Sequence, residues 1–94
     1  MPGTSDGGPA DAPVGTLRNL GPAMERMLDE VGIAGARDLR AVGAVDAFRR
    51  LRFRFGGQVS TVALYALEGA LTDRDWRSFD QEERVRLRVR AAAP

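Results

Sequence analysis

The sequence predicts an all-α fold, a compact array of five short helices of which one is apolar and central. Apolar side chains recur at positions i, i+3, i+4 and i+7 in several stretches, the spacing that lines one face of a helix. Glycine and proline residues fall between these stretches, where they end one helix and start the next. Residues 62–71 are apolar on nearly every side, which is typical of a helix in the middle of a core.

The first 15 residues differ from the rest of the chain in composition. They contain four glycines and three prolines, and Asp6 and Asp11 are their only charged residues. Such a segment buries too little apolar surface to offset the entropy that it loses on ordering. We therefore expect residues 1–15 to form a disordered tail and residues 16–94 to form one helical domain.

The first helix is expected over residues 22–31. Pro22 suits its first position, because the missing N–H would be unpaired there in any residue. Its inward face is apolar, and Gly32 can end it in the left-handed conformation. That ending places Ile33 where it can pack on Leu28.

A second short helix follows over residues 36–42. Gly35 is an acceptable N-cap for it, and Gly43 can end it as Gly32 ends the first helix. The third helix is expected over residues 44–52, with apolar side chains facing inward at a spacing of three residues.

Residues 50–55 alternate strictly between arginine and an apolar residue, which taken alone suggests a strand. The only other alternating stretch is residues 85–90, and pairing the two would set arginine against arginine on one face. We therefore expect the third helix to fray into a loop here, closed by the glycines at 56–57. Phe53 and Phe55 are then candidates for packing over the edge of the core.

The central helix covers residues 62–71, and Ser60 or Gln58 can cap it. Gly69 costs about 1 kcal/mol relative to alanine inside a helix, which is tolerable where another backbone crosses closely. Trp76, the sole tryptophan, is expected to plug the core between this helix and the last one.

The last helix starts after Asp80, which is followed three residues later by Glu83 in the pattern of a capping box. Acidic residues fill its first turn and arginines its later part, an order that complements the helix dipole. The charge pattern therefore supports a helix in this region.

Four stretches, taken in order, resemble a known family. They are Asn19-Leu20-Gly21-Pro22, Val31-Gly32-Ile33, residues 38–45, and residues 64–71 with Trp76. Together they resemble the C-terminal domain of the TfoX/Sxy competence regulators, across about residues 17–91. The resemblance implies an all-helical fold related to helix-hairpin-helix and SAM-like modules. It also implies a link to the regulation of DNA uptake and transcription, and no enzymatic activity.

The composition excludes several classes of function. The chain has no cysteine and no histidine, so disulfides, thiolate metal sites and the commonest general base are absent. Its carboxylates fall on predicted solvent faces, where nothing shifts their pKa values toward catalysis. No apolar run approaches the roughly 18 residues of a membrane-spanning helix, and no secretion signal is present. We predict a cytoplasmic protein without catalytic residues, metal, cofactor, membrane contact or small-molecule substrate.

The first candidate binding site is the hairpin of Asn19 and Gly21. In DNA-binding helix-hairpin-helix proteins the turn has two glycines, whose backbone amides reach a phosphate at a helix N-terminus. Here Asn19 stands at the first glycine position, and asparagine tolerates the left-handed conformation. The resemblance places Ala23 where the family commonly has lysine, and Glu25 would repel phosphate. The hairpin therefore either grips a nucleic-acid backbone or serves only to pack two helices.

A second candidate site is a cluster of arginines. Against Asp38 and Asp46 they give a local charge of +4 between residues 37 and 54, although the whole chain carries only +1. Arginines interleaved with phenylalanines suit a nucleic acid, a protein partner or an ordinary solvated helix face. The members of the cluster are Arg37, Arg40, Arg49, Arg50, Arg52 and Arg54.

We therefore expect a non-enzymatic regulatory module that acts through contacts with a protein or a nucleic acid. Two alternatives stay open at this point. The first is a helix-hairpin-helix domain that binds DNA directly through the hairpin or the arginines. The second is a SAM-like module that associates with further copies of itself.

Overall fold

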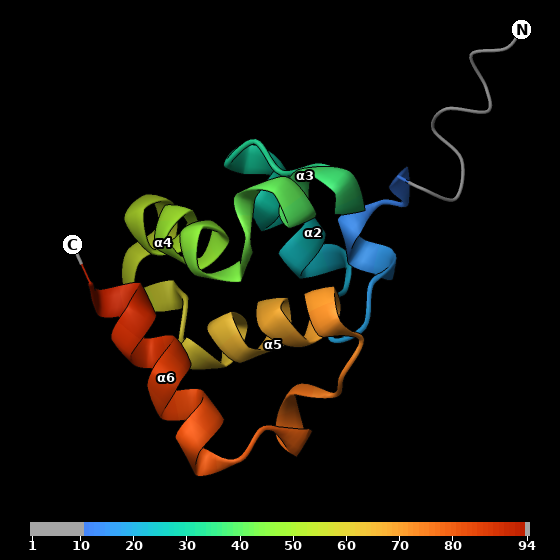
Figure 1. Ribbon diagram of the computed structural model, residues 1–94. Coiled ribbons are helices and arrows are strands. Elements are labelled where there is room, and N and C mark those ends of the chain that lie inside the picture. Colours follow the sequence, from blue (N-terminus) through green and yellow to red (C-terminus); the bar gives the residue numbers. More distant parts are fainter. Residues whose placement is uncertain (1–10, 94) are drawn as a thin grey trace, which may run out of the picture.

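The computed structural model describes residues 11–93. Within this range the chain forms a compact all-α array without strands (Figure 1). Its five α-helices are α2 (Pro22–Glu30), α3 (Ala36–Val42), α4 (Ala44–Phe55), α5 (Thr61–Thr72) and α6 (Gln81–Ala92). A short 3-10 turn, η2 (Val14–Thr16), precedes them, and two more lie between helices, η3 (Gly56–Gln58) before α5 and η4 (Trp76–Ser78) before α6. The predicted fold class is confirmed.

Helix α5 lies in the middle of the array, with α2 and α4 above it and α6 beside its first turns in Figure 1. Leu64 and Leu67 are completely buried in it. Ser60 caps its first turn, because its hydroxyl accepts the backbone N–H of Val62 at 3.3 Å. The central position follows from an apolar surface on nearly every side of the helix, as the sequence predicted.

Two glycine turns place the helices as expected. Gly32 has a φ of 87°, and the backbone N–H of Ile33 donates to the carbonyl of Leu28 at 2.9 Å. Both of these apolar side chains are completely buried. Gly43, also at a φ of 87°, ends α3 and starts α4. Only a residue without Cβ adopts such a φ at low cost.

At Gly69 another backbone segment does cross α5 closely, which is the condition under which a glycine is tolerable there. A Cβ at this position would collide with the carbonyl oxygen of Arg74 and with the side-chain amide of Asn19. The backbone N–H of Arg74 donates to the carbonyl of Gly69 at 2.8 Å, after Asp73 turns the chain with a left-handed φ of 56°. The connection to η4 therefore lies directly on α5.

The third helix is longer than predicted. Helix α4 continues to Phe55 and ends at Gly56, which has a positive φ of 63°. Leu51 and Phe55 are four residues apart, so the helix keeps both on its inner face. Phe53 lies about 200° from Leu51 on the same helix and is 95% exposed. The prediction that Phe53 packs on the core was wrong, because a six-residue alternation conceals the helical period.

The described part of the predicted tail is also ordered. Val14 is completely buried, and its backbone N–H donates to the carbonyl of Ala34 at 3.3 Å. The carbonyl of Ala12 accepts the N–H of Ala36 at 2.7 Å. One apolar side chain and two backbone pairings thus bring this segment onto the start of α3. The remaining predicted tail, residues 1–10, lies outside the described residues.

The C-terminal helix begins as predicted. Asp80 and Glu83 form a reciprocal capping box, with N–H to carboxylate distances of 2.8 and 2.9 Å. Trp76 lies between α5 and α6, where its ring stacks on Tyr65 with centroids 6.4 Å apart, but it is only half-buried. Within residues 11–93, every helix is too short or too polar to cross a bilayer.

Candidate interaction surfaces

The side chain of Asn19 is used inside the domain. Its backbone has the left-handed φ of 72° that the sequence allowed for asparagine. The amide nitrogen donates to the carbonyls of Arg74 at 2.7 Å and Ala66 at 3.4 Å, and the amide oxygen accepts the N–H of Trp76 at 3.3 Å. Asn19 therefore joins the loop before α2 to the segment after α5.

Gly21 is the N-cap of α2, with an extended φ of −143°, and open space surrounds the position where a Cβ would be. Glu25 lies in the first turn of the helix, and Glu25, Arg26 and Asp29 line a shallow depression on its surface. Negative charge beside a helix N-terminus opposes phosphate binding. The geometry therefore favours the packing interpretation of the hairpin.

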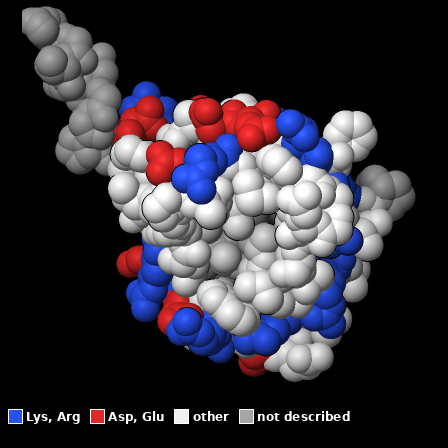
Figure 2. Space-filling model, turned by 180° about the vertical axis from the view of Figure 1, so that it is seen from behind, with Lys and Arg blue, Asp and Glu red and all other residues white. Residues whose placement is uncertain are grey.

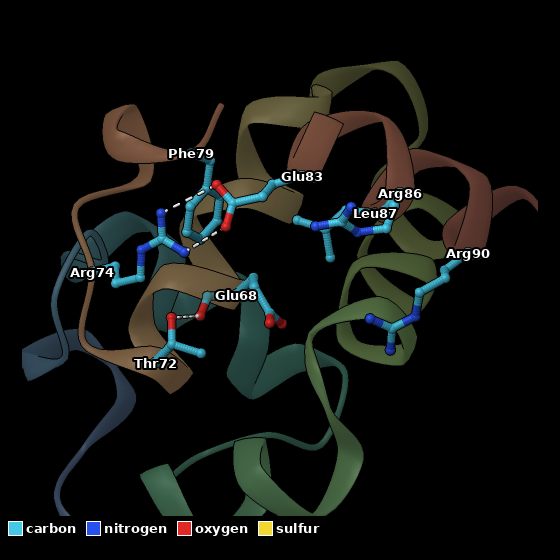
Figure 3. A pocket seen from close by; sticks show the side chains of 8 residues that line it. All are labelled: Glu68, Thr72, Arg74, Phe79, Glu83, Arg86, Leu87 and Arg90. Carbon is cyan, nitrogen blue, oxygen red and sulfur yellow. Dashed lines mark hydrogen bonds and ion pairs between the residues drawn. The ribbon is translucent and has the colours of Figure 1, made fainter. Parts of the chain in front are cut away.

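A polar cleft of about 220 Å³ lies between α5, α6 and the connection between them, which contributes Arg74 and Phe79 (Figure 3). In it Arg74 and Glu83 face each other and form two hydrogen bonds, of 2.8 and 3.2 Å. The Arg74 guanidinium also lies over the ring of Phe79, 4.3 Å from its centroid. These contacts hold the segment after α5 against the start of α6.

The electrostatics of this ion pair do not suit acid–base chemistry. The pKa of Glu83 is lowered to about 2, first by the hydrogen bond from Arg74 and second by the backbone N–H of Asp80. The same pairing raises the pKa of Arg74 above its ordinary value. A carboxylate with so low a pKa neither holds nor accepts a proton near neutral pH. Among residues 11–93 there is also no group of acidic residues arranged to hold a metal ion.

The structure separates the six arginines of the predicted cluster. Arg37 and Arg40 lie exposed on α3, and the other four lie on α4, between its middle and its end. Arg49 donates to the carbonyls of Ala91 at 3.0 Å and Arg90 at 3.4 Å, at the end of α6. The Arg49 guanidinium thus supplies hydrogen-bond donors to carbonyls at the end of the helix, where the helix itself has few donors to offer.

The other arginines of α4 contact neighbouring groups in different ways. Arg50 donates to the carbonyl of Val31 at 3.1 Å, just beyond the end of α2. Arg54 pairs with Glu30 at 2.9 Å. Arg52 lies over the ring of Phe48, 5.4 Å from its centroid. The contacts of Arg49, Arg50 and Arg54 thus join α4 to the ends of α6 and α2.

A groove between α2 and α5 contains the functional candidates that the sequence did not reveal. We call it the α2/α5 groove, and among the described residues no charged side chain lines it. Figure 2 shows one face of the molecule, on which uncharged side chains surround a hollow and charged side chains lie at the edge. The groove is lined by Asn19, Met24, Met27, Gln58, Val59, Ser60, Val62, Ala63, Ala66 and Trp76.

Several of the groove residues are only partly covered, while Val59, Ala63 and Ala66 are buried. Met24, Met27 and Trp76 are half-buried, and Val62 is 41% exposed. Both methionines belong to the apolar inward face expected of the first helix, but periodicity does not tell how much of such a face a neighbour covers. For Val62 the sequence did carry a signal of exposure. This residue lies two positions after the capping Ser60 and so falls in the first turn of α5, at the end of the helix.

Comparison with known proteins gives consistent matches. The TfoX C-terminal domain family matches residues 11–91. The DNA transformation protein TfoX1 of Aliivibrio fischeri is 30% identical over 71 residues, which cover 76% of this chain and 34% of that protein. The chain thus spans about a third of the length of this relative.

Two crystal structures from Listeria monocytogenes are similar in fold. One, an uncharacterized protein in a triclinic form, has a TM-score of 0.75 and 32% identity, covering 82% of this chain and 86% of that chain. The other, a protein of unknown function in a tetragonal form, has a TM-score of 0.74 and 32% identity, covering 81% and 93%. Each of these two fold matches covers more than four fifths of this chain.

Proposed function

Since this chain belongs to the TfoX C-terminal domain family, a domain of competence regulators, we propose that it is a non-enzymatic regulatory module that binds a partner protein. The α2/α5 groove is the surface that carries the proposal. Its lining is uncharged, and it has a volume of about 260 Å³. The occupant that fits it is an amphipathic helix of the partner, which places apolar side chains in the groove.

The composition of the groove supports this choice of occupant. Met24 and Met27 are unbranched and polarizable, so they adapt to the shape of an incoming apolar side chain. Trp76 adds a rigid aromatic wall, of the kind that often anchors protein interfaces. Since a helix presents apolar side chains at i, i+3 and i+4, one helix can place two of them along the groove.

The contacts of the hairpin argue against duplex DNA as a partner at that site. Asn19 uses both ends of its amide inside the domain. Glu25 adds negative charge to the turn that would have to meet phosphate. Both features leave the hairpin suited to packing α2 against its neighbours.

The test compares two exposed valines in the host cell. A strain that lacks the gene receives the wild-type chain, Val62→Arg or Val85→Arg, and its transcripts are profiled. The two positions are matched, because Val62 on α5 is 41% exposed and Val85 on α6 is 39% exposed. Only Val62 lines the groove.

We expect the wild-type chain and Val85→Arg to restore the transcript profile, whereas Val62→Arg fails because a guanidinium enters the apolar groove. Circular dichroism of the purified variants checks that each one is folded. Full restoration by a folded Val62→Arg protein contradicts the proposed groove function.

A further inference from the structure

The most exposed large apolar side chain of the described residues is that of Phe53, at 95%. Successive residues of an α-helix are about 100° apart, so its neighbours on the helix surface follow from their numbers. Arg49 and Arg52 lie on one side of Phe53, and Arg50 and Arg54 lie on the other. We call these five residues, Arg49, Arg50, Arg52, Phe53 and Arg54, the α4 arc.

Three of the guanidiniums are held in place by neighbouring elements. Arg49 bonds the last carbonyls of α6, Arg50 bonds the carbonyl of Val31, and Arg54 pairs with Glu30. Each guanidinium has five N–H donors, so these contacts leave further donors available on each of them. A further anion can therefore be bound without reordering long side chains.

A cleft of about 360 Å³ opens beside the arc, between α4, α5 and α6. Arg49, Arg52 and Arg88 line it, over an apolar floor that includes Phe48 and Leu64. Arg88 is oriented by a hydrogen bond of 2.6 Å to the hydroxyl of Tyr65. Among the described residues no carboxylate lines this cleft. It is therefore suited to an anionic group that stands next to an apolar one.

We propose that the α4 arc binds single-stranded nucleic acid. An unpaired base stacks on Phe53, one neighbouring phosphate lies in the cleft near Arg52 and Arg88, and another lies near Arg50 and Arg54. The ligand needs a flat apolar group between two anions, and a nucleotide strand repeats this pattern. Aromatic side chains beside basic ones bind single strands by the same combination of stacking and charge.

Two observations favour a single strand over a duplex. In a duplex each base is already stacked between its neighbours, so a protruding ring such as Phe53 finds no free base face. The whole chain carries a net charge of only +1, which is little for a surface that has to follow a duplex backbone. DNA and RNA strands share the chemistry that the arc recognises, and the test includes both.

The test is fluorescence anisotropy with labelled 20-nucleotide oligo(dT) and oligo(rU), beside a 20-base-pair duplex, at low salt. We expect one or both single strands to bind, the duplex to bind at least tenfold more weakly, and the affinity to fall as salt rises. An oligoglutamate peptide competes only if charge alone drives binding. The proposal is overturned if the peptide displaces the strand when peptide and strand are present at equal concentrations of negative charge.

Substitutions in α4 test the role of the ring. Phe53→Ala is expected to weaken strand binding by about tenfold or more, and Phe53→Trp to retain it, since stacking is what the ring contributes. Phe53 is so exposed that neither change disturbs the core. Val89→Ala, at a 63% exposed position of α6, is the matched control and leaves binding unchanged. Equal affinity of Phe53→Ala and the wild type, or no strand binding at low salt, contradicts the proposal.

This inference does not rest on the proposed groove function. The anisotropy experiment tests α4, whereas the transcript experiment tests the α2/α5 groove at Val62. Failure of one proposal therefore leaves the result of the other intact.

Discussion

The α2/α5 groove and the α4 arc both present apolar side chains to solvent, but their surroundings are opposite. The groove is concave, uncharged and lined by half-buried residues such as Met24 and Trp76. The arc is convex, and arginines flank an aromatic ring that is 95% exposed. The comparison teaches that the charge around an exposed apolar group, rather than the group itself, indicates which partner it suits.

The two surfaces also differ in how they are held together. Asn19 joins the loop before α2 to the distant segment after α5, and the Arg74–Glu83 pair holds that segment against α6. Together these contacts fix the wall of the groove that carries Trp76. The arc lies on a single helix, and its arginines contact the ends of its neighbours. Substitutions in the groove wall should therefore affect stability, whereas Phe53 can be changed without loss of stability.

The largest effect is expected from Asn19→Ala. This change removes three hydrogen bonds and forces alanine into a φ of 72°. We expect the free energy of unfolding to fall by about 3 kcal/mol, measured by urea denaturation. Asn19→Gly is the matched control, because glycine keeps the left-handed backbone, and it should cost about 1 kcal/mol less. A loss below about 0.5 kcal/mol for Asn19→Ala would show that the wall does not depend on this residue.

A smaller effect is expected from Gly69→Ala. The added methyl group meets the carbonyl of Arg74, which belongs to the backbone and cannot rotate away. Overpacking of this kind outweighs the roughly 1 kcal/mol that alanine gains in helix propensity, for a net loss of about 2 kcal/mol. Gly57→Ala is the control, because nothing lies within 4 Å of its added Cβ. Equal stabilities of the two variants in urea would mean that α5 and the following segment do not cross so closely.

The smallest effect is a pH dependence that originates at Glu83. Its pKa is about 2 in the folded protein against 4.5 as the ordinary value. Because the folded pKa is the lower one, the ion pair stabilises the fold fully above about pH 4.5. Its contribution decreases as the pH falls from there toward 2.

Urea denaturation followed by the fluorescence of Trp76 measures this pH dependence between pH 6 and pH 2.5. The wild type should lose more stability over this range than Glu83→Gln, since glutamine does not titrate. Parallel pH profiles for the two proteins would exclude Glu83 as the source of the dependence.

Much of the fold could be predicted because the sequence specifies it locally. The glycine turns, the cap at Ser60 and the capping box at Asp80 depend on residues within a few positions of one another. Gly69 marked a position where a close crossing was possible, since a glycine inside an apolar helix is tolerable where another backbone comes near. Val14 was missed, because one apolar residue among glycines and prolines gives no periodic signal.

The candidate surfaces were less predictable than the fold. The tolerance of Asn19 for a left-handed backbone follows from its residue type, but its hydrogen bonds to Arg74 and Trp76 depend on how distant segments pack. The exposure of Phe53 follows only from the full length of α4. The groove was missed for a similar reason, because sequence periodicity identifies an apolar face without showing whether a neighbour covers it.

Chemical-shift mapping with a single-stranded oligonucleotide tests most directly whether the two surfaces serve different partners. We predict that the amide signals of residues 49–54 and of Arg88 change during the titration, while those of Met24, Val62 and Trp76 stay in place. Changes centred on the groove or on the hairpin at Asn19 and Gly21, or the absence of any change, would contradict this separation.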